Sequence, residues 1–419
     1  MIDQPELFLR RLFDRAVEVA DPMRSLKDFL PEKPKGRLIV IGAGKASARM
    51  AEAVEAAWGP CEGLVITRYG YARPCQGIEI VEAAHPVPDE AGLEATARML
   101  SLVETAGEGD FILALISGGA SALLVQPVAG VSLVEKQAVN QALLASGAPI
   151  DRMNTVRKHL SRAKGGQLAA AAWPAQLLAL IISDVPGDDP AFIGSGPTVG
   201  DPSTPEEALA VIEQWRVDVP PSVREALSRG SGVVKPFDPR LAGTRNVIYA
   251  APRQSLEAAA ALAREAGCEV RLLGDALEGE AREVAAAQAK EALIVKSGMK
   301  PADAPILLLS GGELTVTRRG DGIGGPNAEF CLALALKLDG AEGIYGLACD
   351  TDGVDGAAEV AGAMIGPETL KRALGANVDP QAALDNNDAH SFFGSINTQV
   401  VTGPTLTNVN DFRAILILP

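Results

Sequence analysis

The segment RLIVIGAGKAS (residues 37–47) joins a short apolar run to a glycine-rich turn and then to a helix-like stretch. A strand that ends in glycines and opens a helix commonly meets a phosphate group, because backbone N–H groups and the helix dipole both favour an anion there. Two uses of such a turn compete. It holds the pyrophosphate of a dinucleotide, or it places Lys45 on a phosphoryl group that is transferred.

The glycine spacing fits a dinucleotide-binding fingerprint only in part. Gly42 and Gly44 match the first two glycines of GxGxxG, but Ser47 stands at the third position. The next strand ends at Arg68 without the acidic residue that holds a ribose, although Arg68 would suit the 2′-phosphate of NADP. The P-loop motif GxxxxGK[ST] is absent. We therefore expect Lys45 to strengthen a phosphate or carboxylate site; a solvated lysine on a tight turn is the simpler alternative.

Similar junctions recur along the chain and predict an α/β fold. Near-continuous apolar strands that alternate with helices indicate a mainly parallel sheet covered on both faces. Ligands of such sheets bind beyond the carboxyl ends of the strands, near a topological switch point, so polar residues there are the candidates for chemistry. The apolar runs that end in Gly, Ser or Asp lie at 37–47, 63–70, 111–121, 177–188, 246–255, 306–315 and 344–356.

The length of the chain favours two domains. A chain of 419 residues exceeds one ordinary core, which leaves room for a subdomain as well. The Gly- and Pro-rich stretch at 228–243 interrupts the periodic pattern and marks the boundary. We predict a Rossmann-like, doubly wound α/β domain at 1–236 and a second α/β domain at 237–419.

The composition narrows the class of protein. A formal charge of −15 argues against a nucleic-acid or anionic-membrane partner. No apolar run approaches the roughly 20 residues that span a bilayer, and residues 1–20 are charged and amphipathic, as in a first helix and not a signal peptide. The five cysteines are scattered without a CxxC pair, which fits a reducing compartment. We expect a soluble cytoplasmic protein.

Two further segments are candidates for binding an anion. In LISGGAS (115–121), Gly118 and Gly119 let backbone amides approach a ligand, and Ser117 and Ser121 add hydroxyls; a tight packing turn is the alternative. The cationic stretch at 151–171 stands out in an acidic chain, and its guanidinium groups suit bidentate contact with a carboxylate or phosphate. A solvated charged face is the alternative there. Its polar members are Asn154, Arg157, Lys158, His159, Arg162 and Lys164.

Aspartates follow two of the apolar runs. Carboxylates at such positions suit Mg²⁺, which takes oxygen ligands, and one of them could accept a proton from an attacking hydroxyl. Asp and Gly are also common turn formers, so this alternative stays open. A calcium loop of the EF-hand type is not completed by the later residues. The aspartates are Asp184, Asp188 and Asp189 in SDVPGDD, and Asp350, Asp352 and Asp355 in CDTDGVDG.

The remaining polar residues give weaker signals. Asn327 and Glu329, in GGPNAEF (324–330), suit either helix caps or ligands. Of the three histidines, His85 in HPVPDE is expected to be structural, and His390 is undecided. Scattered histidines and lone cysteines give no support to a Ser–His–Asp hydrolase or a zinc enzyme.

Taken together, these segments resemble the class II glycerate 2-kinase family, whose C-terminal part is the MOFRL domain. The resemblance implies an ATP- and Mg²⁺-dependent enzyme that phosphorylates D-glycerate at its 2-hydroxyl, giving 2-phosphoglycerate and ADP. It implies two α/β domains with the active site in the cleft between them, and a MOFRL region at about 305–412. Family members are also called hydroxypyruvate reductases, so an NADPH-dependent reductase is the alternative. In order along the chain, the resemblance is carried by IGAGKAS, HPVPDE, LISGGASALL, NTVRKHLSRAKGGQLA, SDVPGDD, GSGPTVGDPST, LSGGELTV, GGPNAEF, TDGVDG and TGPTLTNVND.

The resemblance maps the catalytic lysine of the family onto Lys45 and an aspartate of its SDVxGD segment onto Asp184, with Asp188 close behind. Many relatives carry arginine in a GGRNxE motif where this chain has Pro326, so another cation would have to replace it. We expect glycerate and ATP as the small-molecule partners and leave a homodimer open. We assign substrate contacts to Ser117, Gly118, Gly119, Ser121, Arg157 and Lys164; nucleotide contacts to Gly42, Gly44, Ser47, Gly312, Glu313, Asn327 and Asn408; and Mg²⁺ to Asp184, Asp188 and Asp352.

Overall fold

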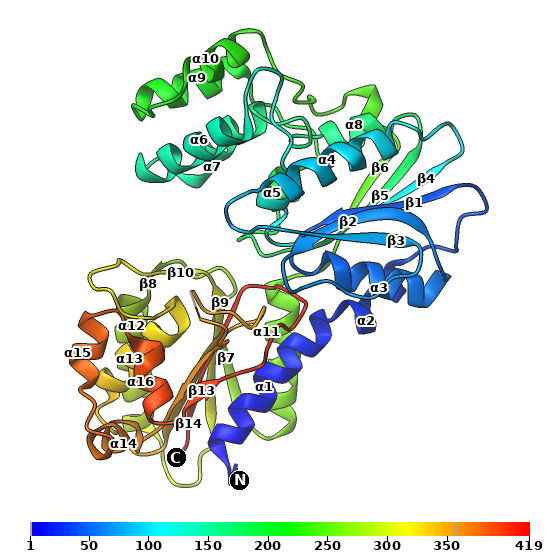
Figure 1. Ribbon diagram of the computed structural model, residues 1–419. Coiled ribbons are helices and arrows are strands. Elements are labelled where there is room, and N and C mark those ends of the chain that lie inside the picture. Colours follow the sequence, from blue (N-terminus) through cyan, green and yellow to red (C-terminus); the bar gives the residue numbers. More distant parts are fainter. Residues whose placement is uncertain (1, 357) are drawn as a thin grey trace. The chain divides into compact units, whose positions relative to one another are not determined.

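The computed structural model describes residues 2–356 and 358–419, and it divides them into two compact units (Figure 1). The first, here the parallel-sheet unit, comprises Pro22–Asp184 and Asp188–Tyr249. The second, the mixed-sheet unit, comprises residues 2–21, Val185–Gly187 and Ala250–Pro419. Among the described helices, none is both long and apolar enough to cross a membrane.

The parallel-sheet unit has the strand order of a doubly wound sheet, as predicted. The order is β3-β2-β1-β4-β5-β6, and β1 to β5 all run parallel. Helix α3 (Ser47–Trp58) covers one face, and α4 (Glu90–Val103) and α8 (Gln167–Ala172) cover the other (Figure 1). The strands are β1 (Leu38–Ala43), β2 (Glu62–Arg68), β3 (Ile78–Ala83), β4 (Phe111–Ile116), β5 (Gln176–Ile182) and β6 (Thr244–Ala250).

A helical subdomain extends the parallel-sheet unit at the top of Figure 1. It has an apolar core of its own, built from residues such as Val139, Val156 and Val211. Two of its helices begin with capping boxes, at Ser132 and at Thr204, which satisfy the first backbone N–H groups of each helix. Residues 151–159 of the cationic segment belong to α7 and so lie in this subdomain, whereas residues 167–171 belong to α8. Its members are α6 (Leu133–Ala145), α7 (Ile150–His159), α9 (Pro205–Gln214) and α10 (Pro221–Ser228).

The mixed-sheet unit is also a three-layer structure. Helices α1 (Pro5–Ala20) and α11 (Pro252–Glu265) pack on one face of its six-stranded sheet, and α12 (Ala281–Gly298) and α13 (Pro326–Leu338) pack on the other. The strand order is β13-β12-β11-β14-β9-β7. A separate two-stranded sheet pairs β8 (Gly279–Glu280) with β10 (Leu314–Thr315). The main strands are β7 (Glu269–Gly274), β9 (Ile306–Gly312), β11 (Ile344–Asp350), β12 (Gly362–Ile365), β13 (Gln399–Val400) and β14 (Asp411–Ile417).

The short elements complete both units. In the parallel-sheet unit they are α2 (Pro22–Ser25), η1 (Leu26–Phe29), α5 (Ala120–Leu123), η2 (Ile193–Ser195) and η3 (Pro239–Leu241); in the mixed-sheet unit they are α14 (Thr369–Gly375), α15 (Pro380–Asp385) and α16 (Ala389–Ser395).

The second sheet is mixed and not mainly parallel, which corrects the expectation for that half of the chain. Strand β14 runs antiparallel to both of its neighbours, β9 and β11, and β12 runs antiparallel to β11. All seven residues of β14 are buried, including the charged Asp411 and Arg413. The apolar runs at 306–315 and 344–356, which the prediction took for parallel strands, became β9 and β11 and pair with it.

The contacts also divide the chain differently from the expected boundary between residues 236 and 237. Strand β6 pairs with β5 and so extends the first sheet to residue 250. The amphipathic helix α1 buries Phe8, Leu12 and Phe13 against the second sheet, so the first residues of the chain belong with its C-terminal part.

Candidate active site

The loops after β1 and β4 lie against each other at the switch point of the parallel sheet. The strand order reverses between these two strands, which is where doubly wound sheets bind their ligands. The Lys45 N–H donates to the Gly118 carbonyl over 2.8 Å, and the Ala46 N–H donates to Ser117 Oγ over 3.0 Å. Ser47 Oγ lies 3.1 Å from Ser117 Oγ. The structure thus brings the GAGKAS and SGGAS segments into one site.

The glycines of GAGKAS are needed for packing between these loops. A Cβ built on Gly44 would lie 2.1 Å from Ser117 Oγ, and one built on Gly42 would lie 2.4 Å from the Leu115 carbonyl oxygen. Gly44 also has a φ of 139°, which disfavours any side chain. In a dinucleotide site the second glycine admits the pyrophosphate instead. Here that space holds Ser117.

The loop amides that remain for a ligand belong to SGGAS and not to GAGKAS. The N–H groups of residues 44 to 47 all donate to protein acceptors, and the nucleotide contacts assigned to Gly42, Gly44 and Ser47 stay a prediction. Among the described residues, the N–H groups of Gly118 and Gly119 have no protein acceptor. Gly119 adopts the left-handed conformation, with a φ of 82°, at the start of α5. An anion at this site would therefore bind to the β4 loop.

Lys45 and His85 flank Gly119. Lys45 is partly exposed, and a Cβ built on Gly119 would lie 3.3 Å from Lys45 Cγ and 3.1 Å from His85 Nε2. His85 follows β3, so strands on both sides of the switch point contribute to this place. His85 was expected to be structural, and the only sequence signal for a place in the site was its position just after a strand. The structure adds it to the candidate residues.

The aspartates after β5 differ from one another. Asp184 follows β5, which neighbours β4, so it lies at the same edge of the sheet as the β4 loop. Asp189 acts as a turn former, because its Oδ1 accepts the Ala191 N–H over 2.9 Å. Asp188 has a φ of 55°, and its buried Oδ1 has no hydrogen-bond partner among the described residues. A buried carboxylate oxygen without a partner is costly, so Asp188 fits a ligand such as Mg²⁺ or a substrate hydroxyl.

The cationic segment divides into two groups with different surroundings. Lys158 is buried and forms an ion pair with Asp201, with 2.5 Å between Nζ and Oδ2. The ring of His159 lies 2.6 Å from Ser231 Oγ and 3.0 Å from Ser203 Oγ. Burial lowers the pKa of His159 to about 4, so the ring is neutral near pH 7. These two side chains hold the following loops to α7 and so have structural roles.

The second group is Arg157 and Lys164, of which Lys164 contacts the β4 loop. Lys164 is almost fully buried, and its Nζ donates to the Ser121 carbonyl and, over 3.0 Å, to Ser121 Oγ. Ser121 Oγ lies 2.8 Å from Ser195 Oγ. Arg157 is partly exposed and donates to Asn154 Oδ1 over 3.3 Å. Burial first, and then neighbouring cations, lowers the pKa of Lys164 well below its usual value. Of the expected substrate residues, Lys164 and the β4 loop therefore lie together, and the contact of Arg157 with the substrate stays a prediction.

In the mixed-sheet unit, Asn327 belongs to a buried polar network. It is fully buried at the start of α13, and its Nδ2 donates to Asp411 Oδ1 over 2.7 Å and to Asp355 Oδ1 over 3.3 Å. His390 Nε2 lies 3.1 Å from Asp355 Oδ2. Burial raises the pKa of Asp411 to about 7, against the opposing effect of Arg413. These contacts give Asn327 a structural role, and its predicted contact with the nucleotide stays a prediction.

The other residues assigned to the nucleotide and the metal lie in varied surroundings. Gly312 is buried with a φ of 98°, Glu313 is exposed, and Asn408 is nearly buried. Asp352 is fully buried, and its Oδ1 accepts the Val354 N–H over 2.8 Å. Within residues 2–356 and 358–419, no three His, Cys, Asp or Glu side chains gather as a metal site. Mg²⁺ often binds through one or two carboxylates and substrate phosphates, so its assignment stays a prediction.

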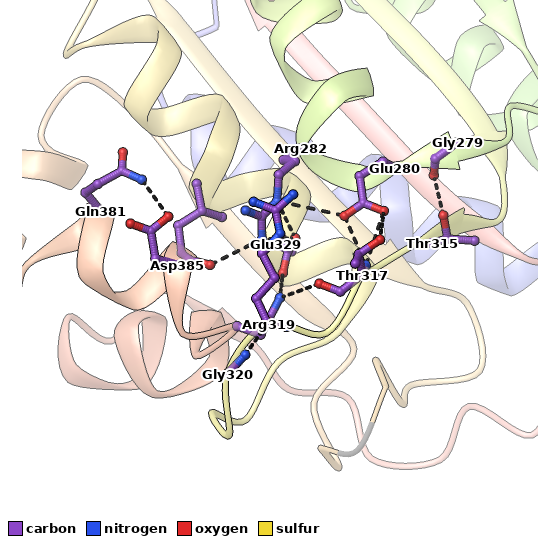
Figure 2. A network of polar contacts seen from close by, with 12 residues as sticks. Gly279, Glu280, Arg282, Thr315, Thr317, Arg319, Gly320, Glu329, Gln381 and Asp385 are labelled. Carbon is purple, nitrogen blue, oxygen red and sulfur yellow. Dashed lines mark hydrogen bonds and ion pairs between the residues drawn. The ribbon is translucent and has the colours of Figure 1, made fainter.

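Glu329 is part of the polar network shown in Figure 2 and is neither a helix cap nor an exposed ligand. It is 1% exposed, and its Oε1 accepts hydrogen bonds from Arg282 Nε and Nη2 over 2.9 and 2.6 Å. Its Oε2 accepts from Asn387 Nδ2 over 2.9 Å. Pro326 occupies the first position of α13, where the fixed φ of proline suits a helix start.

Comparisons with known proteins identify relatives over nearly the whole chain. Residues 8–228 match a domain of unknown function (DUF4147), and residues 306–411 match the MOFRL family. A protein of Agrobacterium vitis that is provisionally named hydroxypyruvate reductase is 53% identical, over 98% of this chain and 94% of its own. The D-glycerate 2-kinase of Thermotoga maritima is 38% identical, over 96% of each chain. A crystal structure of the Thermotoga maritima glycerate kinase gives a TM-score of 0.89 at 37% identity and covers 99% of both chains.

Proposed function

The chain belongs to the class II glycerate kinase family, and on that premise we propose that it transfers the terminal phosphoryl group of ATP to the 2-hydroxyl of D-glycerate. The observation that carries the proposal is the contact between the loops after β1 and β4 at the switch point of the parallel sheet. There Lys45 lies beside two amides that have no protein acceptor among the described residues. A cation and oriented N–H groups at one place stabilise the charge of a transferring phosphoryl group.

The roles of the residues follow from their surroundings. Lys45, with the N–H groups of Gly118 and Gly119, would hold the oxygens of the transferring phosphoryl group. Asp188 offers an unpartnered carboxylate oxygen, either to Mg²⁺ or to the proton of the substrate hydroxyl. Asp184, at the end of the neighbouring strand, would be the second carboxylate. Mg²⁺, when bound with ATP, neutralises phosphate charge; the protein supplies position and orientation.

The substrate carboxylate would bind at the next part of the same edge. Ser121 and Arg157 are both partly exposed, and Lys164 supports Ser121 from behind through two hydrogen bonds. This arrangement would orient the 2-hydroxyl toward the phosphoryl site, because Ser121 and Gly119 are only two residues apart.

The alternative is an NADPH-dependent hydroxypyruvate reductase, the provisional name of the relative that is 53% identical. Two contacts argue against it. Ser117 fills the space at Gly44 that a pyrophosphate would need. Arg68, the candidate for the 2′-phosphate, stacks on the ring of Tyr71 with its Cζ 5.1 Å from the ring centre.

A two-substrate assay separates these functions. Purified protein is mixed with D-glycerate, ATP and Mg²⁺, ADP release is followed, and the product is identified by ³¹P NMR. A parallel sample contains hydroxypyruvate and NADPH and is followed by absorbance. We expect ADP and 2-phosphoglycerate without loss of NADPH. Oxidation of NADPH without ADP release would refute the proposal and the role of Lys45.

A further inference from the structure

Three cations of the parallel-sheet unit influence one another electrostatically and have no carboxylate partner among the described residues. They are Lys136 on α6, Arg157 on α7 and Lys164 in the loop after α7. Lys136 and Lys164 are each 2% exposed. Within the described part of the chain, none of the three forms an ion pair with a carboxylate, whereas Lys158, on the same helix as Arg157, is paired with Asp201.

The three charges influence one another. Burial, and to a smaller extent the Arg157 charge, lowers the pKa of Lys136 to about 8. Burial lowers the pKa of Lys164 as well, and both other cations contribute. Buried charges without partners are expensive, so a folded chain retains such a group where a function requires it. A small anion that binds among them would relieve this cost.

A purely structural role explains the cluster incompletely. Lys136 Nζ donates to the Leu160 carbonyl over 3.1 Å, at the C-terminal end of α7, where a cation is favourable. A neutral donor would also satisfy that carbonyl, and the bond gives no reason for Lys164 to be buried nearby.

We propose that Lys136 is the third cation of the substrate's carboxylate pocket, behind Arg157 and Lys164, and that it sets the preference of the pocket for an anionic substrate. This inference rests on the proposed function, in which the substrate is a small 2-hydroxycarboxylate. Arg157 and Ser121 are partly exposed and would touch the carboxylate. Lys136 is buried and acts through its charge, so it is a positioning residue.

The test compares binding of D-glycerate with that of its neutral amide, glyceramide, by calorimetry at pH 7. Lys136→Gln keeps a donor for the Leu160 carbonyl but removes the charge, and Lys136→Met removes both. Because a charge a few ångströms from a carboxylate in a partly buried site is worth several RT, we expect both variants to bind glycerate about 10- to 100-fold more weakly. Their affinities for glyceramide and ATP should not change.

Thermal unfolding of the ligand-free variants supplies the second measurement. We expect Lys136→Gln to raise the melting temperature, since it removes an unpaired buried charge. A lower melting temperature with unchanged glycerate affinity would show that Lys136 only caps α7 and would overturn the proposal. The matched control is Lys158→Met, which removes a buried lysine that has its own carboxylate partner. It should lower the melting temperature and leave glycerate affinity unchanged.

Hydroxypyruvate, also a carboxylate, separates failure of the pocket from failure of the proposed function. If the protein transfers no phosphoryl group but binds hydroxypyruvate in a manner that depends on Lys136, the kinase proposal fails and the pocket stands. If it phosphorylates glycerate and both Lys136 variants bind glycerate as tightly as the wild type, the pocket fails and the kinase proposal stands.

Discussion

The substitution Arg282→Met tests the polar network of Figure 2. It removes both guanidinium hydrogen bonds to Glu329 Oε1 and leaves a carboxylate that is 1% exposed with Asn387 as its remaining side-chain partner. Methionine keeps most of the length and apolar volume of arginine, so the change acts mainly on charge and hydrogen bonding.

The expected cost follows from burial. Breaking a buried ion pair by removing one partner costs about 3–5 kcal/mol, because the other charge is left without compensation. The side chain of Arg282 is 14% exposed, so water can reach the pair and the lower end of this range applies, about 3 kcal/mol. For a domain of 150–250 residues, this corresponds to a fall of about 6–12 °C in melting temperature.

Differential scanning calorimetry measures this change. The matched control is Arg253→Met, which breaks an exposed pair with Glu257 on α11 and should cost less than about 1 kcal/mol. The double variant Arg282→Met/Glu329→Leu should recover most of the loss, because it leaves no buried charge. A fall of less than about 2 °C for Arg282→Met would refute the reasoning, since it would mean that Glu329 does not depend on its partner.

The remaining predictions concern activity. Lys45→Ala should lower kcat by about 10²- to 10³-fold in a coupled ADP assay with an unchanged melting temperature; near-normal turnover would contradict its role. Asp188→Asn should lower kcat and raise the Mg²⁺ concentration needed for half-maximal rate, and an unchanged Mg²⁺ dependence would exclude it as a ligand. Lys136 has a pKa of about 8 and faces the cations Arg157 and Lys164, so it loses its proton as the pH rises through 8. The KM for D-glycerate should therefore rise above pH 8, and a pH-independent KM would refute this coupling.

Most of the first sheet was predictable from the sequence, because its pattern is local. The apolar runs before GAGKAS, SGGAS and SDVPGDD became β1, β4 and β5, and the prediction of a doubly wound sheet is confirmed. The second sheet was less predictable. A strand that is buried on both faces has the same apolar pattern whether its neighbours run parallel or antiparallel to it. The runs that became β9 and β11 therefore gave no sign that β14 would run antiparallel between them. That direction depends on partners about 70 and 100 residues away along the chain.

The candidate site shows the same limit at the level of side chains. Lys45 and Ser117 could be selected from the sequence, because each lies in a glycine-rich turn that directly follows an apolar strand. Their direct contact could not, since it depends on the order of β1 and β4 in the sheet. Nothing in the sequence indicated that Lys136 is buried, because it lies in an ordinary helical sequence. Its burial comes from α7 and the loop after it. The structural role expected of His85 was inferred only from the residues next to it in the sequence. Its place near Lys45 depends on Gly119, which lies in the loop after β4 and is next to both side chains.

The position of β14 has a consequence for how the chain is made. The mixed-sheet unit takes α1 from the first residues and its central strand from residues 411–417. During translation, the parallel-sheet unit has all of its residues once Tyr249 has emerged. The mixed-sheet unit must wait until β14 leaves the ribosome, with β9 and β11 unpaired along the edges that β14 will fill. Folding therefore proceeds from the middle of the chain to its two ends, and the nascent mixed-sheet unit is the part whose strand edges stay unpaired longest.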